Sequence, residues 1–153
     1  MPILLNKIKT EILNQSIDGC VSRNNEGQIQ YNISVNRISS LDEIPSPYQN
    51  GMMDKFFDEK LTPMLQTNRG CPFSCTFCHD GNRAVNKVNQ FDIERINEEI
   101  RYISDRVPEN INSLFISDLN FGMYKRDIEI CEQISKIKEK SGYPSYIDTT
   151  TGK

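Results

Sequence analysis

The chain has 153 residues, of which 37% are hydrophobic and 25% are charged, a composition typical of a soluble globular protein with its own core. Its net charge is −3, and the scattered Lys and Arg residues argue against a large nucleic-acid-binding face. No apolar run approaches the roughly 20 residues that span a bilayer, and the first residues do not resemble a secretory signal. We therefore expect a cytoplasmic protein with no membrane partner and no nucleic-acid partner.

The first part of the chain predicts small elements. Residues 2–13 place apolar side chains on one face of a helix. Residues 19–33 alternate in the manner of a β-hairpin, with a turn over Asn24–Gly27. This part therefore begins with a small helix and hairpin.

The following segment predicts a connection. Residues 36–50 contain two prolines and show no periodicity, which indicates a linker or a wrapping segment. A short amphipathic helix over residues 52–57 closes it. We interpret residues 1–60 as the end of an upstream domain plus a linker, and residues 61–153 as the next domain.

Residues 61–153 alternate between strand and helix patterns. The predicted elements are strands over 62–67, 113–118 and 146–150, and helices over 91–103 and 127–140. Asp92 is a suitable N-cap for the first helix, and Gly142 a suitable stop for the second.

This alternation predicts an α/β fold in which parallel strands are joined by right-handed crossovers. Three such strands correspond to the first units of a partial (β/α) TIM-like barrel, whereas a complete barrel needs about 250 residues. We therefore expect the chain to be the N-terminal part of an incomplete barrel, and a fragment of a longer polypeptide.

Three cysteines lie close together directly after the first of these strands. Cys71, Cys75 and Cys78 have the spacing CxxxCxxC, and no fourth cysteine is near in sequence. Thiolates are the soft ligands that iron–sulfur clusters and zinc prefer. Three protein ligands would leave one iron of a cubic cluster open for chemistry. Of the other two cysteines, Cys131 is predicted to be a small buried hydrophobe, and Cys20 is assigned no function.

Three other interpretations of the same residues stay open. Cys75–His79 has the CxxCH pattern of haem attachment, which requires export. A Cys3His zinc site would need the adjacent Cys78 and His79 to reach one ion, although zinc ligands are usually spaced further apart. An electron-transfer cluster would need a remote fourth thiolate, either Cys20 or Cys131.

The cysteine spacing resembles the signature of the radical S-adenosylmethionine (radical SAM) enzymes. Residues 67–71 look like the lead-in to their cluster loop. Residues 41–47 and 115–121 resemble segments of the members that are linked to a cobalamin-binding domain. The resemblance implies that Cys71, Cys75 and Cys78 hold a 4Fe–4S cluster and that S-adenosylmethionine binds the fourth iron. It also implies that the cofactor contacts are Phe77, Asp118 and Asn120.

In function, the resemblance implies a radical SAM enzyme that cleaves S-adenosylmethionine reductively to a 5′-deoxyadenosyl radical. A reductant such as flavodoxin or ferredoxin would supply the electron, and the substrate is a small or unknown molecule. Cobalamin-dependent methyl transfer is a further expectation, although the chain contains no DxHxxG-type motif. The alternative is a non-catalytic iron–sulfur electron-transfer module or zinc-binding module, and a fragment of an enzyme can itself be inactive.

Overall fold

The computed structural model describes residues 20–31, 38–82 and 86–151. The chain divides into two compact units, Met1–Ile38 and Ser39–Lys153. The helix predicted over residues 2–13 lies outside the described residues. The predicted boundary after residue 60 stays a prediction, whereas the compact unit that is observed begins at Ser39.

The first unit contains the predicted hairpin. Strands β1 (Val21–Arg23) and β2 (Ile29–Tyr31) pair in antiparallel register. The side-chain oxygen of Asn24 accepts hydrogen bonds from turn backbone N–H groups, including that of Gln28 at 2.8 Å. Gly27 has φ +78°, a conformation in which glycine avoids strain. The β-hairpin predicted from the sequence is therefore confirmed.

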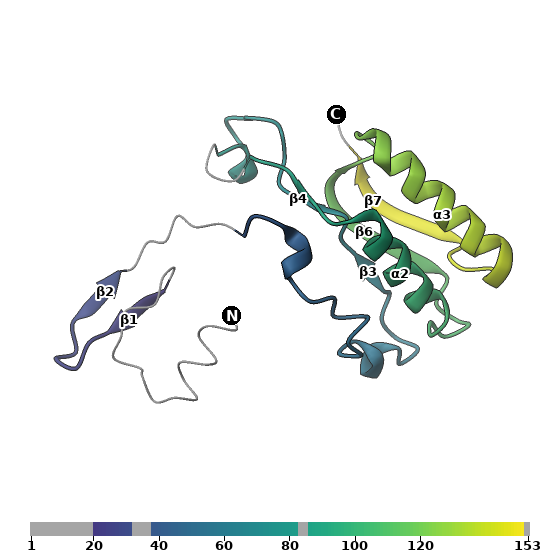
Figure 1. Cartoon of the computed structure of the whole chain (residues 1–153), viewed down its shortest axis with the longest axis horizontal. Helices are drawn as coiled ribbons and strands as arrows, with labels where there is room; N and C mark the ends of the chain where they lie inside the picture. The colour runs from purple at the N-terminus through teal and green to yellow at the C-terminus, as the bar shows by residue number, and fades with distance from the viewer. Residues whose placement is uncertain (1–19, 32–37, 83–85, 152–153) are drawn as a thin grey trace. The chain divides into compact units, whose positions relative to one another are not determined.

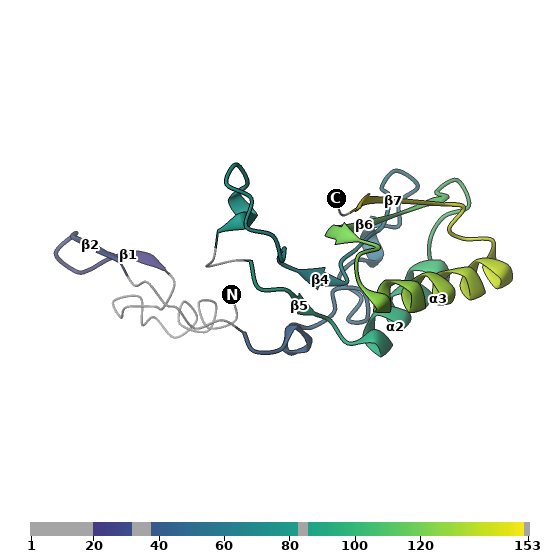
Figure 2. The ribbon, with the colours of Figure 1, turned by 90° about the horizontal axis from the view of Figure 1, so that it is seen from above.

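The second unit is built on a three-stranded parallel sheet. Its strands are β3 (Met64–Leu65), β6 (Ser113–Phe121) and β7 (Tyr146–Thr151), in the order β3-β6-β7. Helices α2 (Ile93–Ser104) and α3 (Lys125–Ser141) connect them. Both helices pack side by side on one face of the sheet (Figures 1 and 2). The α/β class and the parallel pairing are therefore confirmed, and the barrel stays a prediction.

The core lies between this sheet and the helices. Leu114 and Ile116 alternate along β6 and point into it, as period-two strand geometry requires. The buried apolar side chains of the unit are Leu41, Tyr48, Leu65, Phe91, Ile96, Ile100, Ile103, Leu114, Ile116, Phe121, Ile130, Ile134 and Tyr143. Burying one side chain of this size contributes about 1.5–3 kcal/mol.

The helix ends agree with the sequence prediction. The carboxylate of Asp92 accepts the backbone N–H of Glu94 at 2.9 Å and so caps α2. Gly142 follows α3 with φ +80°, and its N–H donates to the carbonyl oxygen of Lys138 at 2.8 Å. Cys131, however, is exposed on α3, so the prediction of a buried cysteine is wrong. It lies one residue after Ile130, about 100° round the helix from that buried side chain.

Residues 39–63, before β3, belong to the second unit and pack against β3 and α2, which fits the wrapping alternative of the prediction. This segment contains two short 3₁₀ turns, Leu41–Glu43 and Asp54–Phe56. The Tyr48 hydroxyl donates to the carbonyl oxygen of Met64 at 2.7 Å and accepts its N–H at 3.1 Å. Tyr48 therefore pairs with the free edge of β3. Tertiary contacts of this kind leave no periodic trace in the sequence.

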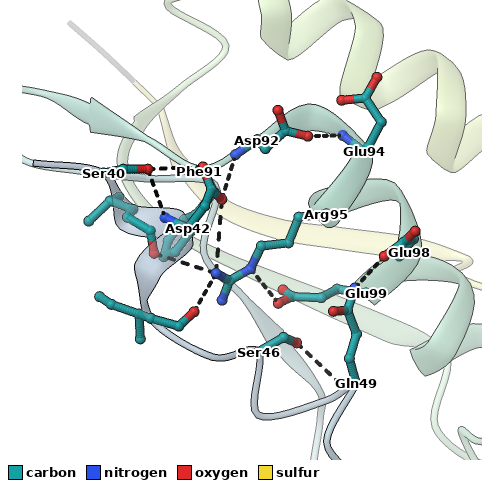
Figure 3. A network of polar contacts seen from close by, with 12 residues as sticks. Ser40, Asp42, Ser46, Gln49, Phe91, Asp92, Glu94, Arg95, Glu98 and Glu99 are labelled. Atoms are coloured by element: carbon teal, nitrogen blue, oxygen red, sulfur yellow. Dashed lines mark hydrogen bonds and ion pairs between the residues drawn. The ribbon is translucent and has the colours of Figure 1, made fainter.

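Arg95 of α2 holds the same segment from the helix side (Figure 3). Its guanidinium donates to the carbonyl oxygen of Ile44 at 2.5 Å and to Glu99 at 3.2 Å. The carboxylate of Asp42 accepts the backbone N–H of Asp92 at 3.0 Å. These bonds fix the segment against the start of α2.

A small antiparallel ribbon interrupts the alternation between β3 and α2. Strands β4 (Asn68–Arg69) and β5 (Asn89–Gln90) pair with each other. Residues 70–82 lie beyond β4 and project away from the parallel sheet (Figures 1 and 2). The ribbon forms the base of the cysteine loop and was not predicted. No helix in the described ranges has the length and apolarity needed to cross a membrane.

Candidate functional site

The three clustered cysteines lie on the loop beyond β4, and all three are free thiols. Cys71 and Cys75 are half-buried, whereas Cys78 is exposed. The loop turns tightly because the N–H of Cys78 donates to the carbonyl oxygen of Cys75 at 3.2 Å. The N–H of Gly81 then donates to the carbonyl oxygen of Cys78, also at 3.2 Å. Two consecutive turns therefore surround Cys78.

Gly81 lies against the backbone of Cys75. A Cβ atom at this position would lie 2.4 Å from the carbonyl oxygen and 2.8 Å from the nitrogen of Cys75. Such contacts are shorter than van der Waals packing allows, so only glycine fits here without moving Cys75. Gly81 thus determines how closely the end of the loop approaches its second cysteine.

A hollow of about 500 Å³ lies on this loop. It is lined by Ser74, Cys75, Thr76, Cys78, His79, Gly81 and Asn82. Two of the three clustered cysteines therefore share one hollow, and Cys71 lies outside its lining. Within residues 20–31, 38–82 and 86–151, no three metal-ligating side chains are gathered for one ion. The three thiols match a three-thiolate cluster in number and chemistry but are not gathered round one point.

Asp118 lies in β6, three residues before its last residue, and its side chain is fully buried. Its carboxylate accepts the backbone N–H groups of Thr67 at 2.7 Å and of Asn68 at 3.2 Å. It also accepts the Thr67 hydroxyl and the Asn68 side-chain amide, the latter at 2.8 Å. These four bonds tie the chain just before the cysteine loop to β6. The predicted contact of Asp118 with S-adenosylmethionine stays a prediction.

Burial raises the pKa of the Asp118 carboxyl above its usual value, while the hydrogen bonds from Thr67 and Asn68 act in the opposite direction. The nearby charge of Asp127 adds a smaller upward contribution. Because both of its oxygens accept hydrogen bonds, the Asp118 carboxylate links β6 to Thr67 and Asn68 inside the protein.

Asn120 contacts the cysteine loop directly. Its side-chain amide nitrogen donates to the sulfur of Cys71 across 3.2 Å. Asn120 is half-buried and follows Asp118 by two residues on β6. The structure therefore brings together a predicted cluster ligand, Cys71, and a predicted cofactor contact, Asn120.

Tyr124 lies close enough to Cys71 to feel the charge of its sulfur, and no sequence pattern predicts this residue as part of the site. Its hydroxyl is buried and has no hydrogen-bond partner in the described part of the chain. Burial is the main reason that the pKa of Tyr124 is raised, and the negative charge of a Cys71 thiolate is the next. A tyrosine shortly after a strand and a glycine carries no pattern that would have singled it out.

Phe77 lies at the outside of the loop, with 81% of its side chain exposed. The resemblance implies that this ring contacts the adenine of S-adenosylmethionine, and its exposure leaves the ring accessible to a ligand. Its role in binding stays a prediction.

No protein-family model matches the chain. The curated proteins that are similar to it in sequence include two methyltransferases. The 2-(S-pantetheinyl)-carbapenam-3-carboxylate methyltransferase of Streptantibioticus cattleyicolor is 36% identical over 111 residues, which cover 69% of this chain and 16% of that protein. The cobalamin-dependent radical SAM methyltransferase TokK of Streptomyces tokunonensis is 32% identical over 117 residues, covering 72% of this chain and 17% of that protein. The chain thus spans about a sixth of the length of these relatives.

A solved structure shares the fold. It is the cobalamin-dependent S-adenosylmethionine radical enzyme OxsB with aqua-cobalamin and S-adenosylmethionine bound. The match has a TM-score of 0.62 at 21% identity and covers 88% of this chain and 20% of that one. The three-cysteine loop after β3, the parallel sheet and these matches lead to one conclusion: the chain belongs to the radical SAM superfamily and resembles its cobalamin-dependent members.

Proposed function

We propose that this chain supplies the cluster-binding segment of a radical SAM enzyme. Cys71, Cys75 and Cys78 would hold three irons of a 4Fe–4S cluster, and S-adenosylmethionine would bind the fourth. The observation that carries the proposal is the position of the cysteine loop. It follows β3 of a parallel sheet and is fastened by Asp118 to the neighbouring strand β6. Chemistry in α/β barrels takes place at this end of the strands.

The protein residues have separate tasks in this proposal. When bound, the cluster would supply the electron for the reductive cleavage of S-adenosylmethionine. Asp118 holds the backbone that leads into the loop, and Gly81 allows the loop to turn on Cys75. Phe77, exposed on the loop, is a further proposed contact with the cofactor, and so is Asn120, which is half-buried beside Cys71. A direct contact between Asp118 and S-adenosylmethionine would require its carboxylate to give up one of its bonds to Thr67 or Asn68, so we propose the anchoring role for it.

The complete reaction is proposed to be a methyl transfer that uses cobalamin. Both curated relatives are named methyltransferases, and one of them is named cobalamin-dependent. A small-molecule substrate, a reductant of the flavodoxin or ferredoxin kind and a cytoplasmic location complete the proposal. The remaining strands of a TIM-like barrel would be needed for the complete substrate site.

Anaerobic reconstitution with iron and sulfide tests the proposal. We expect about four irons and four sulfides per chain, and an electron paramagnetic resonance (EPR) signal that changes when S-adenosylmethionine is added. Alanine at Cys71, Cys75 or Cys78 should abolish the cluster. Cys131→Ala is the matched control and should leave it intact, because Cys131 lies exposed on α3.

The same experiment separates the alternatives. A cluster whose signal ignores S-adenosylmethionine would indicate an electron-transfer module. Retention of one zinc ion, with no cluster formed, would indicate a zinc module. Either result contradicts the proposed enzyme.

A further inference from the structure

The contact between Asn120 and Cys71 extends the proposed function and rests on it. The two residues lie 49 positions apart in sequence, yet the Asn120 amide nitrogen and the Cys71 sulfur are 3.2 Å apart. An N–H group at this distance makes a short hydrogen bond to sulfur. Within the described part of the chain, this bond links the side chain of a β6 residue directly to a cysteine of the loop.

Both ends of this bond are held in place. On the β6 side, Asn120 lies between Asp118 and Phe121, which are both buried. The hydroxyl of Thr150 on β7 donates to the carbonyl oxygen of Asp118. The backbone of β6 is therefore bonded to β7 on both sides of Asn120. An amide in such a setting is pre-organised, because little of its freedom is left to lose when it donates.

On the loop side, the backbone before Cys71 is fixed by the same strand. Asp118 accepts the N–H groups of Thr67 and Asn68. Asn68 and Arg69 form β4, which pairs with β5. Cys71 thus begins the loop from a fixed base, whereas Cys75 and Cys78 lie farther out on the turns.

A hydrogen bond donated to a ligand sulfur has a known electronic effect. It stabilises negative charge on the sulfur, and a reduced iron–sulfur cluster carries one more negative charge than an oxidised one. A donor on a ligand thiolate therefore favours the reduced cluster and raises the reduction potential. The effect is larger in a partly buried site, where water screens the charge less.

We propose that Asn120 is a positioning residue that donates its side-chain amide to Cys71 and thereby raises the reduction potential of the cluster. This role differs from a direct contact with S-adenosylmethionine. A donor of this kind makes the first electron transfer to the cluster easier. The other two cysteines receive no such side-chain bond from β6 among the described residues.

The central test compares midpoint potentials in the reconstituted protein, followed by EPR during a reductive titration. Asn120→Leu keeps a similar volume and removes the donor, and Asn120→Asp replaces the donor with a carboxylate. We expect the equilibrium for reduction to fall about tenfold in the leucine variant, which is about 59 mV for a one-electron couple. The reduction potential of the aspartate variant should fall further. Asn112→Leu, the same change at an exposed residue directly before β6, should leave the potential unchanged.

A metal-free measurement tests the contact itself. In the iron-free full chain, NMR follows the side-chain amide protons of Asn120. Cys71→Ala should shift one of these resonances and speed its exchange with water, and Cys131→Ala should do neither. An Asn120 signal that ignores Cys71→Ala would overturn the contact and with it the inference.

The outcomes separate this inference from the proposed function. If the wild-type protein forms no 4Fe–4S cluster, the proposed function fails and the inference falls with it, even where the NMR contact is present. If the cluster forms and Asn120→Leu has the wild-type potential, the inference alone is wrong. If Asn120→Leu assembles no cluster, the Asn120→Gln variant tests the amide donor instead. A normal cluster and potential in Asn120→Gln support the amide donor, and loss of the cluster there contradicts it.

Discussion

The Asp118 carboxylate on β6 accepts the backbone N–H of Thr67 at 2.7 Å, although the two residues lie 51 positions apart in sequence. Asn68 donates to the same carboxylate through both its backbone and its side chain. One buried side chain therefore joins the strand that precedes the cysteine loop to the centre of the sheet. This link is structural whatever ligand the site takes.

Asp118→Asn should destabilise the protein strongly. The substitution keeps the shape of the side chain but turns one acceptor oxygen into an amide that faces N–H donors. Because buried donors of Thr67 and Asn68 lose their acceptor, we expect the free energy of unfolding to fall by about 2–4 kcal/mol. Urea unfolding followed by circular dichroism measures this change.

The matched control is Asp148→Asn on β7. Asp148 is exposed, so the same chemical change there should alter the free energy of unfolding by about 0.5 kcal/mol or less. Equal losses in the two variants would show that Asp118 has no special structural role.

Gly81→Ala should impair iron uptake while leaving the core intact. A methyl group at this position would overlap the backbone of Cys75, so the loop must shift and carry Cys75 with it. We expect the iron content after anaerobic reconstitution to fall at least severalfold, with little change in the thermal midpoint because the loop lies outside the core.

Thr76→Ala tests whether any substitution in the loop has this effect. Thr76 is exposed in the same turn, and its truncation creates no overlap, so iron uptake should remain normal. Normal iron uptake in Gly81→Ala would mean that the cluster does not depend on the position of Cys75 seen here.

Arg95→Leu should loosen the segment that precedes β3. The substitution removes the bond to the Ile44 carbonyl oxygen and leaves Glu99, which is 6% exposed, without its cation. Loss of one partner of a buried ion pair costs about 3 kcal/mol. Chemical unfolding should report a loss of this size, and hydrogen exchange should speed up over residues 40–49.

Two further variants test whether the lost ion pair causes the loss of stability in Arg95→Leu. Arg101→Leu changes an exposed arginine of the same helix and should have little effect. The double variant Arg95→Leu with Glu99→Leu should recover part of the loss, because neither charge is then buried alone. If the double variant is as unstable as the sum of both single variants, the ion pair is not the reason.

Tyr143 should make stability depend on alkaline pH. Its hydroxyl donates to the Ser113 carbonyl oxygen at 2.9 Å, and burial raises the pKa of Tyr143 well above 10. Near pH 10 the unfolded tyrosine loses its proton and the folded one keeps it. The unfolded state then binds fewer protons, so the free energy of unfolding falls as pH rises, by up to about 1.4 kcal/mol per pH unit from this group.

Tyr143→Phe isolates this contribution. At neutral pH the variant should be less stable by about 1 kcal/mol, because it lacks the hydrogen bond to Ser113. Above pH 10 the stability curves of the wild type and the variant should converge. The stability curve of Tyr146→Phe, a change at an exposed residue of β7, should run parallel to that of the wild type throughout. Parallel curves for Tyr143→Phe as well would contradict the assignment.

The elements with local signals were predictable from sequence. Asp92 and Gly142 mark helix ends through capping chemistry that acts within a few residues, and both are seen in these roles. The apolar run over residues 113–118 located β6, although the strand continues to Phe121. The cysteine spacing indicated the family, which the relatives support.

Contacts between distant segments were not predictable. The β4–β5 ribbon consists of two-residue strands, which are too short to show any period. Tyr48 is buried although its segment has no periodic pattern, because its neighbours come from β3 and α2. The prediction for Cys131 failed because a residue next to a buried one on a helix points elsewhere. The partners of Asp118 and Asn120 could be found only from the fold.

The bond between Asp118 and Thr67 also has a consequence for the order in which the protein matures. A ribosome adds roughly 5–20 residues per second, so the 51 residues that separate the two take roughly 3–10 s to make. For most of that interval the three cysteines have already been added to the chain, but the strand that fixes their loop does not yet exist. Productive metal loading is therefore expected after translation of β6, and thiols exposed before then depend on the reducing conditions of the cell.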